Sequence, residues 1–187
     1  MKTMCYFRNH FLIAMPALND ANFARTVTLI CEHNQDGAMG IIINRPLSIT
    51  LDQMLQHIKV KDYPQAVGEM PVFLGGPVQQ ERGFVLHRPI GHWETTLKIG
   101  DEVGMTTSRD ILDAITQGKG PPQTLIALGY AGWGPHQLEQ ELAENAWLST
   151  PASSTVVFDT PYQQRWEAAA ALAGVDLSRL SGEIGHA

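Results

Sequence analysis

The clearest pattern in the chain lies between residues 124 and 148, where an apolar run is followed by glycines and then by an amphipathic stretch. Residues 124–130 are apolar over the length of a strand. Three glycines then interrupt the pattern, and glycine allows a backbone to turn where other residues clash. The pattern therefore predicts a strand that ends in a loop containing Gly129, Gly132 and Gly134.

The loop leads into a predicted helix. Pro135 suits the first helical position because its missing N–H is not needed there, which makes Gly134 the capping residue. Gln137 is then the third helical residue and is expected to accept a hydrogen bond from the cap N–H. Trp133 and Leu138 have the spacing of a hydrophobic staple, so we expect them to pack together. The apolar face of this helix comprises Leu138, Leu142, Ala143, Ala146 and Trp147.

The rest of the chain predicts more strands and three more helices, and no repeat or linker divides it. Hairpins alternate with strand–helix units, which indicates one α/β (α+β) domain over residues 1–187. We expect a mixed β-sheet, bent toward a pseudo-barrel and flanked by about four helices. The predicted strands are residues 11–15, 26–33, 38–43, 72–74, 83–87, 95–99, 102–105 and 155–158, and the further helices follow caps at Thr50, Thr107 and Thr160.

Charge and composition narrow the classes of function. The net charge is −6, from 13 basic and 19 acidic residues, and no run of Lys or Arg occurs. Non-specific nucleic-acid binding needs a basic surface, so direct DNA binding is not expected. The longest apolar run, Phe11 to Leu18, is far shorter than the ~20 residues of a membrane helix. Two cysteines, Cys5 and Cys31, are typical of a reduced, cytoplasmic protein.

Polar and glycine-rich strand ends supply the candidate binding site. Arg45 follows a predicted strand and offers a two-pronged contact for an anion, or it pairs with Glu139 or Glu141 to fix the fold. Glycines after another strand allow either a ligand or a sharp turn. The candidate cleft comprises Asn44, Arg45, Gly75, Gly76, Trp133, Gln137 and Glu141.

Catalytic and metal chemistry receive little support from the sequence. Cys31 and His33 share one strand face, as a nucleophile and its base could. Val27 and Leu29 share that face too, which favours a buried, unreactive Cys31 beside a half-exposed His33. No histidine spacing is typical of a metal site, and we expect no cofactor. No catalytic residue is assigned.

Four segments, in order, resemble one protein family over nearly the whole chain. They are FLIAMP (11–16), CEHNQDGAMGIIINRP (31–46), FLGGPV (73–78) and GYAGWGPHQLEQEL (129–142). These resemble the bacterial AlgH/YqgE family, whose usual loop reads W-G-P-G-Q-L-E where this chain has His136 in place of the second glycine. The resemblance implies a bent-sheet or pseudo-barrel α/β fold, an unassigned biochemical activity, and a link to regulation of alginate synthesis and of transcription.

Two hypotheses of function follow. The first is a regulator that acts indirectly, by binding another protein or a ligand, and it agrees better with the acidic charge than DNA binding does. The second is a small-molecule enzyme or sensor, with Arg45, Gly76 and the Trp133 loop around one cleft. The first is preferred, because no strong catalytic constellation is present.

Overall fold

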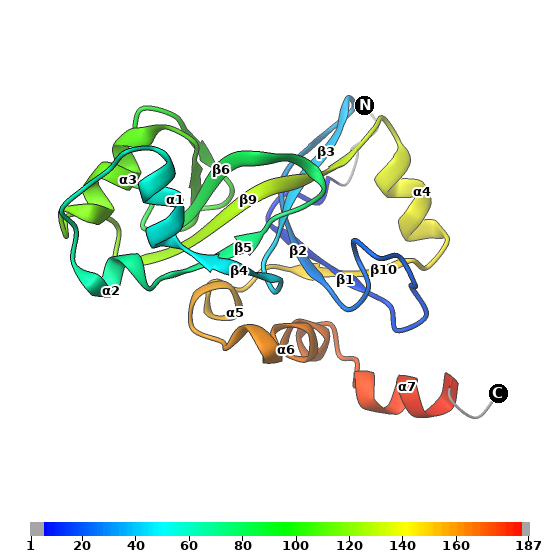
Figure 1. Cartoon of the computed structure of the whole chain (residues 1–187). Helices are drawn as coiled ribbons and strands as arrows, with labels where there is room; N and C mark the ends of the chain where they lie inside the picture. Colours follow the sequence, from blue (N-terminus) through cyan, green and yellow to red (C-terminus); the bar gives the residue numbers. More distant parts are fainter. Residues whose placement is uncertain (1–5, 185–187) are drawn as a thin grey trace.

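The computed structural model describes residues 6–184, so Cys5 lies outside the described residues. Its centre is the long strand β9 (Gln123–Trp133). One end of β9 runs antiparallel to β3 (Gly37–Ile42). The other end lies between β5 (Pro71–Leu74), to which it is parallel, and β6 (Val78–Arg88), to which it is antiparallel. Figure 1 shows β9 crossing the molecule, so two groups of strands share it.

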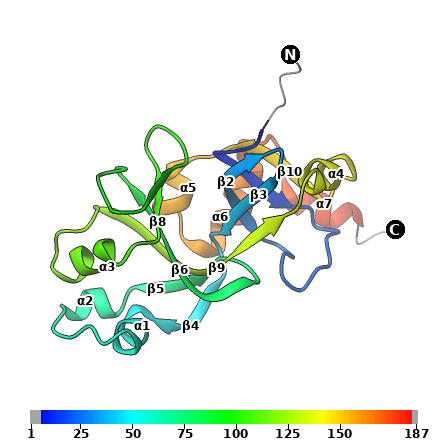
Figure 2. The same cartoon turned by 90° about the horizontal axis from the view of Figure 1, so that it is seen from above.

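The hydrogen-bonded path through the sheet has the order β10-β1-β2-β3-β9-β6-β8-β7. Strands β4 and β5 lie off this path, and β5 joins β4 to β9. The sheet is mixed and curls into a half-barrel (Figure 2), which confirms the expected fold class. The remaining strands are β1 (His10–Ala14), β2 (Val27–Asn34), β4 (Pro46–Thr50), β7 (Thr96–Lys98), β8 (Gly104–Thr106) and β10 (Trp147–Pro151).

Residues 6–184 contain seven α-helices and one 3-10 helix, where the sequence predicted about four helices. The four predicted helices are present, and α2, α5 and α7 are additional. None of the helices in the described part of the chain has the length and apolar character needed to span a membrane. The helices are α1 (Leu51–His57), α2 (Gln65–Gly68), α3 (Arg109–Thr116), α4 (Gln137–Ala143), α5 (Ser154–Phe158), η1 (Tyr162–Gln164), α6 (Arg165–Leu172) and α7 (Leu177–Ile184).

The core consists of three apolar clusters, and β9 contributes to all of them. Leu125 and Ala127 face the largest cluster, which α5 and α6 cover. Ile126 points to the opposite face, where α1 and α3 pack. Beyond Gly129, Ala131 and Trp133 join the cluster beneath α4. Figure 1 shows these helices on different sides of the sheet, as the alternation of side chains along a strand requires.

The predicted end of the central strand was wrong. β9 continues through the glycines to Trp133, and only Gly129 has a left-handed backbone, with φ of +77°. Helix α4 then begins at Gln137, so Pro135 precedes it. The predicted bond is nevertheless present, because the Gly134 N–H donates to Gln137 Oε1 at 2.9 Å. Gly129 therefore bends this strand, and none of the glycines up to Gly132 ends it.

Two further predictions were wrong for related reasons. Residues 155–158 were expected to be a strand because of their β-branched side chains, yet they lie in α5. Val156 and Val157 are both buried, and adjacent residues of a strand would point to opposite faces. Trp147 was assigned to the face of α4 but begins β10, from which it still packs beneath that helix. Burial against the core overrode local propensity in both segments.

Gly76 shows how closely the backbones approach around β9. A Cβ atom at Gly76 would lie 2.0 Å from the backbone carbon of Tyr130, and one at Gly75 would lie 2.3 Å from the carbonyl oxygen of Gly129. Backbone atoms cannot move aside as the end of a flexible side chain can. These glycines are therefore required for the packing of the β5–β6 connection on β9.

We predict that Gly76→Ala lowers the free energy of unfolding by about 3 kcal/mol, the upper part of the usual range for overpacking. Gly83→Ala is the matched control, because its Cβ would meet only the Met54 methyl group, at 3.1 Å. Urea denaturation of the two variants measures the difference. Equal stabilities would contradict the close approach.

His87 is a buried polar group whose hydrogen bonds are satisfied within the sheet. Its Nδ1–H donates to the Pro89 carbonyl at 2.9 Å, and its Nε2 accepts from the Thr106 hydroxyl at 2.7 Å. Thr96 continues the chain, with its hydroxyl 2.9 Å from that of Thr106. Burial lowers the pKa of His87 below its ordinary value, because a charged imidazole would lose its hydration.

We predict that acid destabilises the fold through His87. The unfolded chain takes up the proton near pH 6.5 and the folded chain resists it, so this stability is present above about pH 6.5 and is lost as the pH falls below that value. One proton gives a slope of up to about 1.4 kcal/mol per pH unit. Urea midpoints between pH 7.5 and 5 measure it, and His87→Gln should flatten the slope. An unchanged slope would rule out His87 as the cause.

Candidate functional site

An open groove of about 710 Å³ lies between the β2–β3 hairpin and the part of the sheet formed by β6, β8 and β7. The left-handed backbone of Gly129 interrupts the alternation of β9, so the side chains after it meet surroundings different from those of the side chains before it. Tyr130 and Gly132 line the groove, whereas Ala131 packs beneath α4. The groove floor is largely apolar and contains Phe84, whose ring meets that of Tyr130 edge-on at 5.8 Å.

Charged side chains stand at two walls of the groove. Glu32 and Asp36 come from the β2–β3 hairpin, and Arg82 comes from β6. The Arg82 guanidinium lies over the Phe84 ring, 5.2 Å from its centroid. None of these three side chains forms an ion pair with another residue of the described region 6–184. The groove therefore offers a ligand one cationic and one anionic wall.

Trp133 lines the groove and is held in place by helix α4. Its indole N–H donates to Glu141 Oε1 at 3.1 Å, and the indole N–H of Trp147 donates to the same oxygen at 3.0 Å. Gln137 donates to the other carboxylate oxygen at 2.9 Å. Trp133 and Leu138 belong to one apolar cluster, as the predicted staple requires. Glu141 thus positions two aromatic rings.

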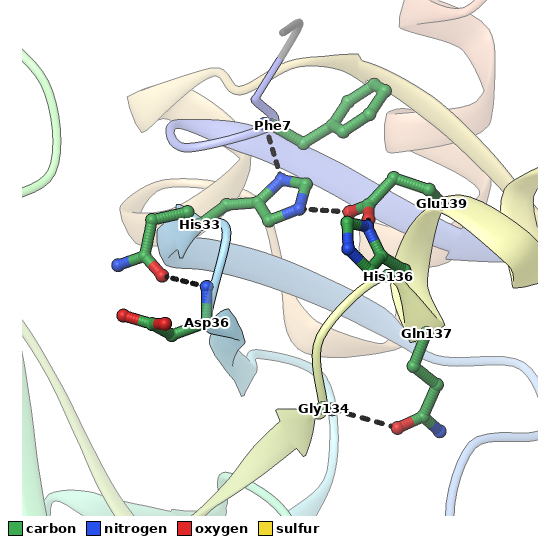
Figure 3. Close-up of polar contacts among 8 residues, drawn as sticks. Phe7, His33, Asp36, Gly134, His136, Gln137 and Glu139 are labelled. Carbon is green, nitrogen blue, oxygen red and sulfur yellow. Dashed lines mark hydrogen bonds and ion pairs between the residues drawn. The ribbon is translucent and has the colours of Figure 1, made fainter.

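The hairpin wall of the groove is tied to the same helix (Figure 3). His33 is buried, contrary to the half-exposed position predicted for it. Its Nδ1 accepts the Phe7 N–H at 2.9 Å, so Nε2 carries the proton and donates to Glu139. His136 lies 3.6 Å from the other oxygen of Glu139. This contact between β2 and α4 fixes the hairpin whose turn carries Asp36.

His136 also explains the departure from the usual family loop. Its backbone is left-handed, with φ of +64°, and a glycine adopts that conformation without strain. The His136 side chain is exposed, so this position has room for a side chain as well. Backbone conformation accounts for a glycine at this position in the family.

The predicted contact between Arg45 and helix α4 was wrong. The Arg45 guanidinium donates instead to the carbonyls of Ala21, Asn22 and Ala24, at 2.7 to 3.0 Å. Asn44 accepts the Val27 N–H and donates to the Arg25 carbonyl, both at 2.9 Å. Both side chains therefore hold the segment between β1 and β2. Glu141, which was offered as a partner for Arg45, accepts hydrogen bonds from the indole N–H groups of Trp133 and Trp147 instead.

The seven residues of the predicted cleft thus occupy three places. Asn44 and Arg45 hold the segment after β1, and Gly75 and Gly76 pack on the backbone of β9. Trp133, Gln137 and Glu141 lie together on α4 and the end of β9, and of the seven only Trp133 lines the groove. A binding role for all seven stays a prediction.

Cys31 is fully buried, as predicted, and burial raises the pKa of its thiol far above the ordinary value. Its sulfur contacts the Leu29 carbonyl at 3.5 Å. Among residues 6–184, no group of three or more His, Cys, Asp or Glu side chains has an arrangement that could hold a metal ion.

Apart from Trp133, the residues that line the groove were not predicted. Glu32 and Asp36 belong to the family segment 31–46 and Arg82 to none of the four segments, and the three come together only through the curl of the sheet. One signal was present, because Glu32 interrupts an apolar strand. The register of β2 against β3 shifts between Ile30 and Glu32, which marks a bulge there.

Fold and groove define an α+β protein with a curled half-barrel sheet and an open cleft between the β2–β3 hairpin and strands β6, β8 and β7. The model of the AlgH-like family matches residues 11–178, and the chain belongs to that family. A UPF0301 protein of Nitrosococcus oceani is 94% identical over 187 residues, covering 100% of both chains. A UPF0301 protein of Thioalkalivibrio sulfidiphilus is 56% identical, covering 97% of both chains.

Two solved structures share the fold. The AlgH protein of Pseudomonas aeruginosa has a TM-score of 0.81 and 48% sequence identity, with 97% of each chain covered. A protein of Corynebacterium diphtheriae has a TM-score of 0.70 at 19% identity, with 90% of this chain and 87% of that chain covered. The second likeness concerns the fold alone.

We predict that Glu141→Ala lowers the free energy of unfolding by about 2 kcal/mol or more, since two nearly buried indole N–H groups lose their acceptor. Glu141→Gln retains an acceptor oxygen and should cost less than about 1.5 kcal/mol. Glu144→Ala removes an exposed carboxylate at the C-terminal end of the same helix, just after its last residue, and should change stability by less than about 0.5 kcal/mol. Chemical denaturation followed by tryptophan fluorescence measures all three. Equal losses for the two alanine variants would contradict this role.

Proposed function

We propose that this protein is a regulatory binding protein that acts on transcription indirectly, by taking a small ligand or a segment of another protein into the groove. The observation that carries the proposal is the groove itself. Its volume of about 710 Å³ lies within the roughly 300–1,000 Å³ of small-molecule sites. Such sites combine an apolar lining with a few placed polar groups, as this one does.

The indirect mode of action is supported by charge. The chain carries a net charge of −6, and two of the charged side chains in the groove are carboxylates, Glu32 and Asp36. Both would repel a phosphate backbone. Tight, sequence-specific retardation of duplex DNA by the pure protein at physiological salt would contradict this part of the proposal.

A cytoplasmic location belongs to the same proposal. Cys31 is a free, fully buried thiol, which is compatible with the reducing conditions of the cytoplasm. The alternative of an enzyme or sensor with a cleft at Arg45 and Gly76 has less support. The Arg45 guanidinium already binds three backbone carbonyls, and Gly76 lies against the backbone of Tyr130.

We predict that filling the groove abolishes binding without unfolding the protein. Gly132 lines the groove, and a Cβ there would meet only the edge of the Tyr130 ring, at 3.4 Å. Gly132→Leu should therefore place an isobutyl group in the groove without backbone strain. Gly134→Leu is the matched control, because Gly134 is exposed two residues further on and does not line the groove.

A thermal-shift screen against cytoplasmic metabolites and short peptides measures this effect. A ligand at 100 times its Kd stabilises the folded state by about 2.7 kcal/mol. For a chain of this size, that corresponds to roughly 5–10 °C in Tm. Ligands should raise the Tm of the wild type and of Gly134→Leu, and should fail to raise that of Gly132→Leu. Equal shifts in all three proteins would place binding outside the groove and contradict the proposal.

A further inference from the structure

We infer that the groove selects small zwitterionic ligands with an apolar body, of the class of short apolar peptides with free termini. This inference rests on the proposed function and adds the class of ligand to it. It follows from the placement of charge on the two walls and from the apolar floor between them.

The anionic wall is the β2–β3 hairpin. Glu32 is exposed between the buried Cys31 and His33, because successive side chains of a strand point to opposite faces, and Asp36 lies in the turn that follows. The Asp36 N–H donates to Asn34 Oδ1 at 2.8 Å, which fixes the turn. Figure 3 shows the Asp36 carboxylate pointing away from His33, whose Nε2 is bound to Glu139 of α4. An ammonium group is the complement of this wall.

The cationic wall is Arg82 on β6. Its position over the Phe84 ring holds the guanidinium at the edge of the apolar floor. Its one hydrogen bond to another described residue is a long contact of 3.5 Å to Gln79, so donors remain for a ligand. A guanidinium binds a carboxylate through two parallel hydrogen bonds, which makes a terminal carboxylate the natural complement.

The spacing of the walls suits a short peptide. β2 and β6 are three strand intervals apart in the sheet order, or about 14 Å along a flat sheet. The curl of the sheet and the reach of the Glu32 and Arg82 side chains shorten this span. An extended dipeptide separates its terminal charges by about 7 Å. Between the walls, Met39, Tyr130 and Met105 offer surface to apolar side chains.

A ligand with a single charge meets one attractive and one repulsive wall. A free amine is drawn to Glu32 and Asp36 but repelled by Arg82, and a free carboxylate meets the reverse. A zwitterion satisfies both walls at once, provided that its charges are separated. This difference can be measured with one peptide in four chemical forms.

The experiment titrates the ¹⁵N-labelled full-length protein with leucyl-phenylalanine, its N-acetyl form, its C-terminal amide and the doubly blocked form, at low ionic strength. Amide chemical-shift changes locate the site and give each Kd. The free dipeptide should bind up to about fivefold more tightly than either singly blocked form, the size expected of an exposed ion pair. The preference should shrink in 0.5 M NaCl, where the Debye length falls to about 4 Å.

Charge-neutral variants assign each end of the ligand. The double variant Glu32→Gln and Asp36→Asn should lose the preference for the free amine and keep that for the free carboxylate. Arg82→Gln should do the opposite. These side chains are exposed, so the variants are expected to fold, and the dispersion of the amide spectrum verifies it.

Each outcome bears on one proposal. Equal affinity for all four forms at the groove overturns the zwitterion class and leaves ligand binding intact. The dipeptide could cause no chemical-shift changes at the groove while other compounds bind there and Gly132→Leu abolishes their binding. That result overturns the zwitterionic class of ligand and leaves the proposed function intact. Failure of every compound to bind in a Gly132-dependent manner contradicts the proposed function itself.

Discussion

The structure depends on the close approach of two backbones at the middle of β9. This strand pairs with β3, β5 and β6, and it contributes side chains to all three apolar clusters. The connection between β5 and β6 lies so near to β9 that Gly75 and Gly76 leave no room for a Cβ atom. Gly129 lies at the same place, with its left-handed backbone. Three glycines thus join two groups of strands into one curled sheet, at the cost of some conformational entropy.

The groove is a consequence of that junction. The backbone of β9 is left-handed at Gly129, and this interrupts the regular alternation of its side chains. The next side chain, that of Tyr130, therefore lines the groove. The hairpin that forms the opposite wall pairs with β9 through β3 and is held in addition by helix α4. Hydrogen bonds from His33 to Glu139 and from Trp133 to Glu141 attach the hairpin and the end of β9 to this helix. The helix therefore maintains the shape of the groove from outside it.

Several polar residues that the sequence offered as a binding site serve the fold instead. Arg45 and Asn44 satisfy backbone carbonyls in the segment before β2 and the N–H of Val27 at the start of β2. Buried or half-buried backbone groups need partners, and a side chain at a strand end is well placed to supply them. A polar residue after a strand is thus equally suited to a ligand or to the chain itself, and only the tertiary structure distinguishes the two cases.

The sequence by itself determined the elements whose signals are local. The strand before Gly129, the helix after it and the bond from Gly134 to Gln137 follow from spacing, and the burial of Cys31 follows from its neighbours on one strand face. Tertiary structure decided what local signals leave open. Val156 lies in a helix because the core accepts its side chain there, against its strand propensity. The groove could not be predicted from the sequence for the same reason. Its walls come from strands far apart in the chain and meet only because the sheet curls.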